Sequence, residues 1–173
     1  SPNVLVVGAS SPYRTLAELL AAARARPGAL SYGTAGAGSS LFLFMELLKA
    51  RAGVDILHVV YRGSAPALAD VLAGNLTMVF DSVPSAIGQI RSGPLRALGV
   101  SPAERGAVLP DVPTIAEAGI PGFAQESWLG LAAPAATPPA VIERLNAEAN
   151  AILADPAIRA RLEGMGTRPV GGT

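Results

Sequence analysis

The chain has 173 residues, half of them hydrophobic and 15% charged, which fits one domain with a sizeable core and argues against disorder. Lys and Arg total 13, as do Asp and Glu, so the chain lacks the basic excess typical of proteins that bind nucleic acid or anionic membranes. The lack of cysteine excludes disulfides, thiolate zinc sites and thiol nucleophiles.

Strand-like and helical segments alternate along the chain. Apolar runs predict strands at residues 4–7, 30–32, 56–61, 76–80, 95–100, 127–132 and, as a last short candidate, 167–170. Capping residues, prolines and glycines predict helices at residues 15–26, 41–50, 64–73, 82–92, 114–119, 139–154 and 156–165. This order predicts an α/β fold, with helices layered around a largely parallel sheet.

Particular residues mark several helix starts. Thr114 and Glu117 have the spacing of a capping box. Ser64 is a candidate cap for the helix that follows the third strand, and Thr137 precedes a proline at the start of residues 139–154.

The segment 31–40, SYGTAGAGSS, connects a predicted strand to the next helix and is the strongest functional signal. Its glycines permit positive φ angles, and Ser39 or Ser40 suits the N-cap position. Free amides at such a helix start, with the positive end of the helix dipole, favour an anion. The spacing G-x-x-G-x-G differs from the dinucleotide motif, and no Gly-Lys-Ser/Thr follows. The segment therefore indicates a carboxylate more than a nucleotide, and a connection that binds nothing remains the alternative.

Two further strand-to-helix turns, at residues 62–66 and 81–85, follow predicted parallel strands, so we expect them at the same edge of the sheet. Open α/β sheets bind ligands at this edge, beyond the carboxyl ends of their strands. Asp81 ends a strand and either accepts a hydrogen bond from a ligand hydroxyl or ammonium group or caps the next helix. Tyr61 is either a hydrogen-bonding residue at the rim or a packed aromatic.

A catalytic constellation is not apparent. His58, the sole histidine, lies inside an apolar strand, which favours a packed imidazole over a general base. No nucleophile elbow or set of metal ligands occurs. We therefore predict no catalytic residue, metal or cofactor. A doubly wound enzyme that uses the glycine-rich turn for a phosphorylated or carboxylate substrate is the weaker alternative.

Several segments together resemble the substrate-binding receptors of tripartite tricarboxylate transporters, the Bug family. They cover essentially the whole chain in the family's order, at residues 30–40, 58–74, 80–81, 95–98, 109–119, 133–134 and 137–139. The resemblance implies a type II periplasmic-binding-protein fold, in which two α/β lobes joined by crossing strands close on a small organic acid. It also implies a periplasmic receptor without catalytic activity that delivers a mono- or dicarboxylate to membrane permease subunits.

The resemblance also implies a division of the chain and a set of ligand-binding residues. Residues 1–8 would form a hinge strand, residues 9–126 the second lobe, and residues 127–173 a hinge strand with helices of a truncated first lobe, the signal peptide and the rest of that lobe being absent. The implied ligand-binding residues are Tyr32, Gly33, Thr34, Ala35, Gly36, Gly38, Ser39, Ser40, Tyr61, Gly63, Ser64 and Asp81.

Two expectations follow from departures from the family's pattern. Phe42 stands where the family usually has a histidine, so the ligand is expected to be less charged or differently placed. Half a cleft should bind weakly, and its exposed apolar surfaces leave self-association open. The effector-binding domain of a transcription regulator shares this architecture and is a further alternative.

Overall fold

Five strands form one mixed sheet in the computed structural model, which describes residues 1–173. The strands are β1 (Asn3–Gly8), β2 (Ser31–Thr34), β3 (Leu57–Val60), β4 (Met78–Ser82) and β5 (Leu95–Val100), in the order β3-β2-β4-β1-β5. β2 is parallel to β3 and β4, whereas β1 is antiparallel to both β4 and β5. Four strands therefore share one direction and β1 runs against them.

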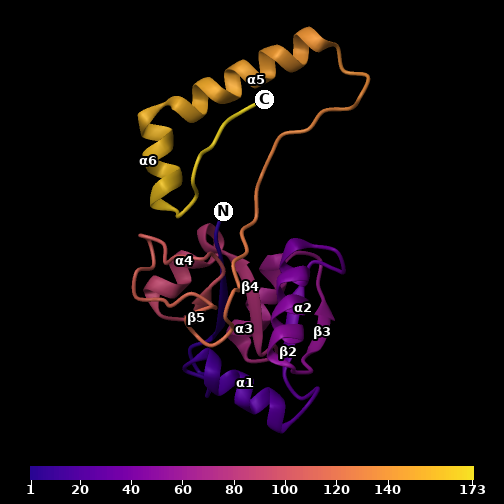
Figure 1. The fold of residues 1–173 in the computed structure, drawn as a ribbon, viewed down its shortest axis with the longest axis vertical. Helices are drawn as coiled ribbons and strands as arrows, with labels where there is room; N and C mark the ends of the chain where they lie inside the picture. Colours follow the sequence, from indigo (N-terminus) through magenta and orange to yellow (C-terminus); the bar gives the residue numbers. More distant parts are fainter.

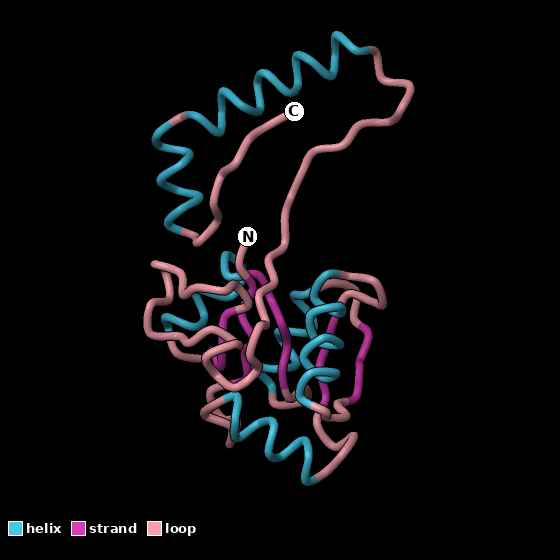
Figure 2. Tube along the Cα trace, in the orientation of Figure 1, coloured by secondary structure: helices cyan, strands magenta, loops and turns pink.

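Helices cover both faces of this sheet (Figures 1 and 2). They are α1 (Leu16–Ala25), α2 (Ser40–Ala52), α3 (Ser64–Ala73) and α4 (Val83–Ser92). α1 and α2 contribute to a core of 20 buried residues, and α3 and α4 to a second core of 13. The observed α/β architecture agrees with the predicted one. No helix combines the length and the hydropathy that crossing a bilayer requires.

β1 shows why its sequence is a continuous apolar run. Leu5 and Val7 belong to the core of α1 and α2, and Val4 and Val6 to the core of α3 and α4. Successive side chains of a strand point to opposite faces, so a strand that lies between two helical layers needs apolar residues at every position.

Residues beyond 126 form an arm that extends away from the sheet (Figure 1, orange to yellow). The arm contains α5 (Pro139–Ala154) and α6 (Pro156–Gly164), neither of which has a buried residue. It returns to the rest of the chain near Gly166, where an added Cβ would lie 2.8 Å from Cγ2 of Val108. We call residues 1–126 the lobe and residues 127–173 the arm.

Two predicted strands and one predicted helix are wrong. Residues 127–132 and 167–170 form no strand: the backbone of Ser127 pairs only with Ser1, which precedes β1, and neither segment joins the sheet. Residues 114–119 form turns, although the capping box is present: Thr114 N–H donates to Glu117 Oε2 at 2.8 Å, and Glu117 N–H to Thr114 Oγ1 at 3.0 Å. Gly119, with a φ of 122°, and Pro121 stop the chain from continuing as a helix.

Two predicted caps are also wrong. Gly63 is the N-cap of α3, which places Ser64 inside the helix, and no side chain caps this end. Pro138 occupies the N-cap position of α5 in place of Thr137. The proline side chain has no oxygen that could accept a hydrogen bond from the first N–H groups of the helix.

Candidate ligand-binding site

The carboxyl ends of β2 and β4 lie side by side at one edge of the sheet. From β2 the chain passes through α2 to β3 at the outside, whereas from β4 it passes through α4 to β5, beyond β1 on the other side. Such a reversal of direction opens a crevice beyond the strand ends, which is where open α/β sheets bind ligands. The starts of α2, α3 and α4 all lie at this edge, as predicted, because each helix directly follows a parallel strand.

The glycine-rich turn is held by its own hydroxyl groups. Thr34 Oγ1 accepts from Gly36 N–H at 3.1 Å. Ser39 is the N-cap of α2 and accepts from Phe42 N–H at 3.3 Å, and its hydroxyl donates to the Gly36 carbonyl at 3.0 Å. Gly36 and Gly38 have φ angles of 125° and 90°, which favour glycine.

Only part of the turn's backbone is free to bind an anion. The N–H of Gly36 donates to Thr34 and that of Ser39 to the Gly36 carbonyl, so neither is available. The N–H groups of Ala37, Gly38 and Ser40 donate to no group of the chain, and these three residues are exposed. Within residues 36–40, the amides left free for a ligand are therefore those of Ala37, Gly38 and Ser40.

Asp81 is the most unusual polar residue at this edge. It is 3% exposed, and its Oδ1 accepts from Ser82 N–H at 2.8 Å, whereas its Oδ2 is buried without a hydrogen-bond partner. Burial raises the pKa of Asp81 above its usual value, although the nearby Ser85 hydroxyl and the hydrogen bond from Ser82 N–H oppose this shift. A buried carboxylate oxygen without a donor is costly, so this position is suited to a donor that the chain does not supply.

The remaining predicted residues divide between the edge and the packed interior. Gly63 and Ser64 start α3 at the same edge. The Tyr61 side chain contacts α3, where its hydroxyl donates to Asp70 Oδ2 at 2.7 Å. This hydrogen bond, together with burial, raises the pKa of Tyr61. Gly33 is buried under α3, where an added Cβ would lie 3.0 Å from Ala67 Cβ.

Tyr32 lies inside the core and does not face the edge. It is fully buried, and its hydroxyl donates to Glu46 Oε1 at 2.5 Å. Burial raises the pKa of Tyr32, and the hydrogen bond to Glu46 and its charge raise it further. Burial acts to raise the pKa of Glu46 too, but hydrogen bonds from Lys49 and Tyr32 outweigh it and lower that pKa. His58 stacks on the Tyr32 ring, which agrees with the packed imidazole predicted from the sequence.

Two residues at the edge were missed by the sequence analysis. Asn3 is buried at the start of β1, and its Nδ2 donates to Ser127 Oγ at 3.0 Å. The Ser127 hydroxyl in turn lies 3.4 Å from that of Ser40, the first residue of α2. The segments that enter and leave the lobe therefore lie beside the glycine-rich turn. An asparagine next to the apolar run of β1 was the available signal for this contact.

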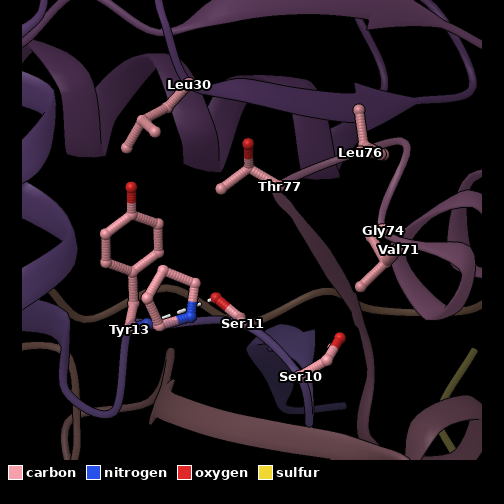
Figure 3. Close-up of a pocket in the computed structure, with 10 residues that line it drawn as sticks. Ser10, Ser11, Tyr13, Leu30, Val71, Gly74, Leu76 and Thr77 are labelled. Atoms are coloured by element: carbon pink, nitrogen blue, oxygen red, sulfur yellow. Dashed lines mark hydrogen bonds between the residues drawn. The ribbon is translucent and has the colours of Figure 1, made fainter.

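A cavity of about 310 Å³ lies at the opposite edge of the sheet (Figure 3). Its walls include Ser10, Tyr13, Leu30 and Thr77, and no charged side chain lines it. Neither this cavity nor a smaller one beside Arg168 contains any predicted ligand-binding residue. The cavity therefore lacks the positive counter-charge that favours an anion. No cluster of three or more His, Asp or Glu side chains could hold a metal ion.

Sequence comparisons with known proteins point to one family. The sequence model described as "Tripartite tricarboxylate transporter family receptor" matches residues 1–173. A Pseudomonas sp. protein from the tcbD–tcbE intergenic region is 49% identical over 172 residues, which cover 99% of this chain and 51% of that protein. Protein BugT of Bordetella pertussis is 36% identical over 169 residues, which cover 98% of this chain and 52% of that protein.

Solved structures agree with the sequence comparison. Rpa4515 of R. palustris, solved with adipate, superposes with a TM-score of 0.94 at 38% identity, over 99% of this chain and 57% of that one. MatC of Rhodopseudomonas palustris, with bound malate, gives a TM-score of 0.91 at 32% identity, over 97% of this chain and 57% of that one.

The chain thus spans about half the length of the two curated relatives named above. The matched family is one of receptors, which agrees with the prediction of a binding protein and not an enzyme. The family match over all 173 residues, the relatives and the shared fold lead to one conclusion: this chain belongs to the tripartite tricarboxylate transporter receptor family.

Proposed function

We propose that this chain supplies one lobe of a periplasmic receptor that binds a small organic carboxylate and delivers it to the permease subunits of a tripartite tricarboxylate transporter. The observation that carries the proposal is the meeting of free amides and a partnerless buried carboxylate oxygen at one edge of the sheet. Solved relatives that contain adipate and malate support the class of ligand.

The two groups suit different parts of one ligand. The N–H groups of Ala37, Gly38 and Ser40, at the start of α2, receive a carboxylate, which the helix dipole also favours. Oδ2 of Asp81 receives a hydrogen-bond donor, such as a hydroxyl or ammonium group. An ionised Asp81 repels a second carboxylate, so this residue selects ligands by the group they place at its oxygen. No bond of the ligand is broken.

The proposal includes a second lobe to which the arm contributes. Trp128, Leu129 and Leu131 are 85%, 89% and 89% exposed, and α5 and α6 bury no residue, so the arm lacks a core of its own. The superposition on Rpa4515 covers 99% of this chain, arm included, within a longer protein. These observations support residues 1–8 and 127–131 as the two connections between lobes and residues 132–173 as part of the other lobe.

An NMR titration of the ¹⁵N-labelled chain with adipate and with malate tests the ligand site. Because one lobe encloses only half of a ligand, we expect dissociation constants in the millimolar range. Amide shifts should concentrate at Ala37, Gly38 and Ser40 and be absent from Ser10 and Tyr13 at the opposite cavity.

Asp81→Ala supplies the matched variant. It should change the ranking of adipate, which has no hydroxyl group, against malate, which has one, while the amide shifts stay at the turn. Shifts confined to the cavity around Tyr13, or no shifts with either acid, would contradict the proposal.

A further inference from the structure

Thr34 and His58 form a hydrogen-bonded pair next to the glycine-rich turn, and His58 has no proposed contact with a ligand. Thr34, the last residue of β2, is 2% exposed, and its Oγ1 lies 2.7 Å from Nε2 of His58 on β3. The same Oγ1 accepts from Gly36 N–H at 3.1 Å. The Thr34 hydroxyl therefore joins an imidazole on the neighbouring strand to the first glycine after β2.

The imidazole of His58 is held on two sides by aromatic rings. The Tyr32 ring stacks on it, with centroids 4.9 Å apart and planes 19° apart. The Phe42 ring on α2 lies against it at the same centroid distance, tilted by 48°. This packing fixes the plane of the imidazole and keeps its Nε2 at the Thr34 hydroxyl.

The Thr34 hydroxyl can bond to His58 and to Gly36 at the same time. A threonine hydroxyl has one hydrogen and two lone pairs, and Gly36 N–H uses one of the lone pairs. The contact of 2.7 Å with His58 Nε2 is a hydrogen bond in either imidazole tautomer: Thr34 donates to a bare Nε2, or a protonated Nε2 donates to the second lone pair. In both cases His58 fixes the orientation of the hydroxyl that accepts from Gly36.

Gly36 needs such a restraint because nothing packs against it. No atom lies within 4 Å of the position that its Cβ would occupy, and its φ of 125° is in the region that glycine occupies freely. Thr34 fixes its N–H and Ser39 fixes its carbonyl. The orientation of Gly36 determines where the following free amides of Ala37 and Gly38 point.

We infer that His58 is a positioning residue of the ligand site: it orients the Thr34 hydroxyl, which fixes Gly36 and thereby aims the free amides of the turn. The inference rests on the proposed function as far as the ligand is concerned. The ordering of the turn by His58 needs no ligand and is measured separately.

Amide hydrogen exchange in the ligand-free chain measures the ordering. His58→Phe keeps an aromatic ring in contact with Tyr32 and Phe42 but removes the nitrogen that bonds to Thr34, and should speed exchange at Gly36 about 3- to 10-fold, the effect of one lost hydrogen bond. His58→Gln places an amide near the position of Nε2 and should restore exchange to within about twofold of the wild type. Exchange at Leu5 in β1 reports any change in global stability.

A double variant and a matched control separate positioning from general destabilisation. His58→Phe combined with Thr34→Val should equal Thr34→Val alone, because His58 acts only through that hydroxyl. Thr77→Val removes a hydroxyl that accepts from Ser31 N–H at the other end of β2, and should leave Gly36 unchanged. Additive effects in the double variant, unchanged Gly36 exchange in His58→Phe, or no restoration by His58→Gln would each overturn the inference.

A titration with adipate completes the test. Its affinity should fall about 3- to 10-fold in His58→Phe and recover in His58→Gln. Equal affinity in all variants would overturn the inference and leave the proposed function standing. If adipate and malate fail to bind the wild-type chain, the proposed function fails, and the Gly36 exchange rates still decide whether His58 orders the turn.

Discussion

At the scale of single residues, Asp81 combines deep burial with an unsatisfied oxygen. The chain supplies one donor to its carboxylate, the N–H of Ser82, and leaves Oδ2 without any. Most buried polar groups of folded proteins have a partner, and exceptions concentrate where a ligand completes the set. Asp81 therefore costs stability in the free lobe, and a suitable ligand would offset that cost.

Asp81→Asn should stabilise the ligand-free chain at neutral pH. The pKa of Asp81 is raised in the folded state by burial, so at pH values between the ordinary and the raised pKa the folded state holds a proton that the unfolded state has lost. Stability therefore falls as pH rises from the ordinary Asp value, about 3.9, through the raised value. Asp81→Asn cannot lose stability in this way. We therefore expect its free energy of unfolding to be about 1–3 kcal/mol higher than that of the wild type at neutral pH, and this difference should disappear below the ordinary Asp pKa. Urea unfolding across a pH series measures it.

Asp70→Asn is the control for that experiment. Asp70 accepts a hydrogen bond from the Tyr61 hydroxyl at 2.7 Å, so its charge has a partner. Its replacement should lower stability or leave it unchanged at neutral pH. A loss of stability in Asp81→Asn, or the same gain in both variants, would contradict the assignment of an uncompensated carboxylate.

Sequence reasoning placed Asp81 at a strand end but left its environment open. Whether such a residue caps a helix, faces solvent or is buried depends on the neighbouring strands and helices, which a local pattern does not specify. Tyr32 illustrates the same limit. Its place in the motif suggested the ligand edge, whereas the pleat of β2 turns its ring into the core and its hydroxyl to Glu46, which is partly exposed. The prediction that Tyr32 binds a ligand remains untested.

At the scale of elements, α3 lies so close to β2 that only glycine fits between them. A Cβ on Gly33 would lie 2.7 Å from Cδ2 of Leu76, and 3.0 Å from both Ala67 Cβ and Tyr61 Cε2. The end of Leu76 can rotate away, but Ala67 belongs to the helix itself. This close approach brings the start of α3 to the ligand edge.

Gly33→Ala should lower the free energy of unfolding by about 1–3 kcal/mol, because the added methyl group pushes α3 from the sheet. Gly88→Ala is the matched control: Gly88 lies in α4 with no atom within 4 Å of its Cβ position, and the variant should gain about 0.5–1 kcal/mol from helix propensity. Chemical denaturation compares the two variants. A neutral Gly33→Ala would mean that α3 moves without cost.

The helices of the chain could largely be predicted, but the arrangement of its strands could not. Proline, glycine and capping residues gave helix ends within a residue or two, as at Gly53 and Gly93, which follow α2 and α4. The apolar run of β1 indicated a strand buried on both faces and contained no information on direction, so its antiparallel pairing was not predictable. Residues 127–131 have strand-like composition but do not join the sheet, since strand pairing depends on segments distant in sequence.

At the scale of the whole molecule, the lobe holds all the buried residues except Pro169, and the arm exposes apolar ones. Exposed side chains of the arm include Trp128, Leu129, Leu131, Val141, Ile142, Leu145, Ile152 and Val170. Apolar residues on this scale are unusual for a surface that stays in water. They are the kind of exposed apolar surface that leaves self-association of the 173-residue chain open.

A chain that ends at residue 127 should fold as the full chain does, with a melting temperature within about 3 °C, because α5 and α6 bury no residue. Light scattering over a concentration series should show association for residues 1–173 and a monomer for residues 1–127. A monomeric full chain at high concentration would remove the prediction of self-association, and an unfolded shorter chain would mean that the lobe depends on the arm.

The entry to the lobe and its exit are tied together. The amino group of Ser1 donates to the Ser127 carbonyl at 2.6 Å, and Ser127 N–H donates to the Ser1 carbonyl at 3.0 Å. A segment whose two ends meet can be spliced into a surface turn of another protein with little loop-closure entropy. Residues 1–127 therefore form a natural cassette for domain grafting, and joining its ends would allow circular permutants opened at an exposed turn such as Gly53.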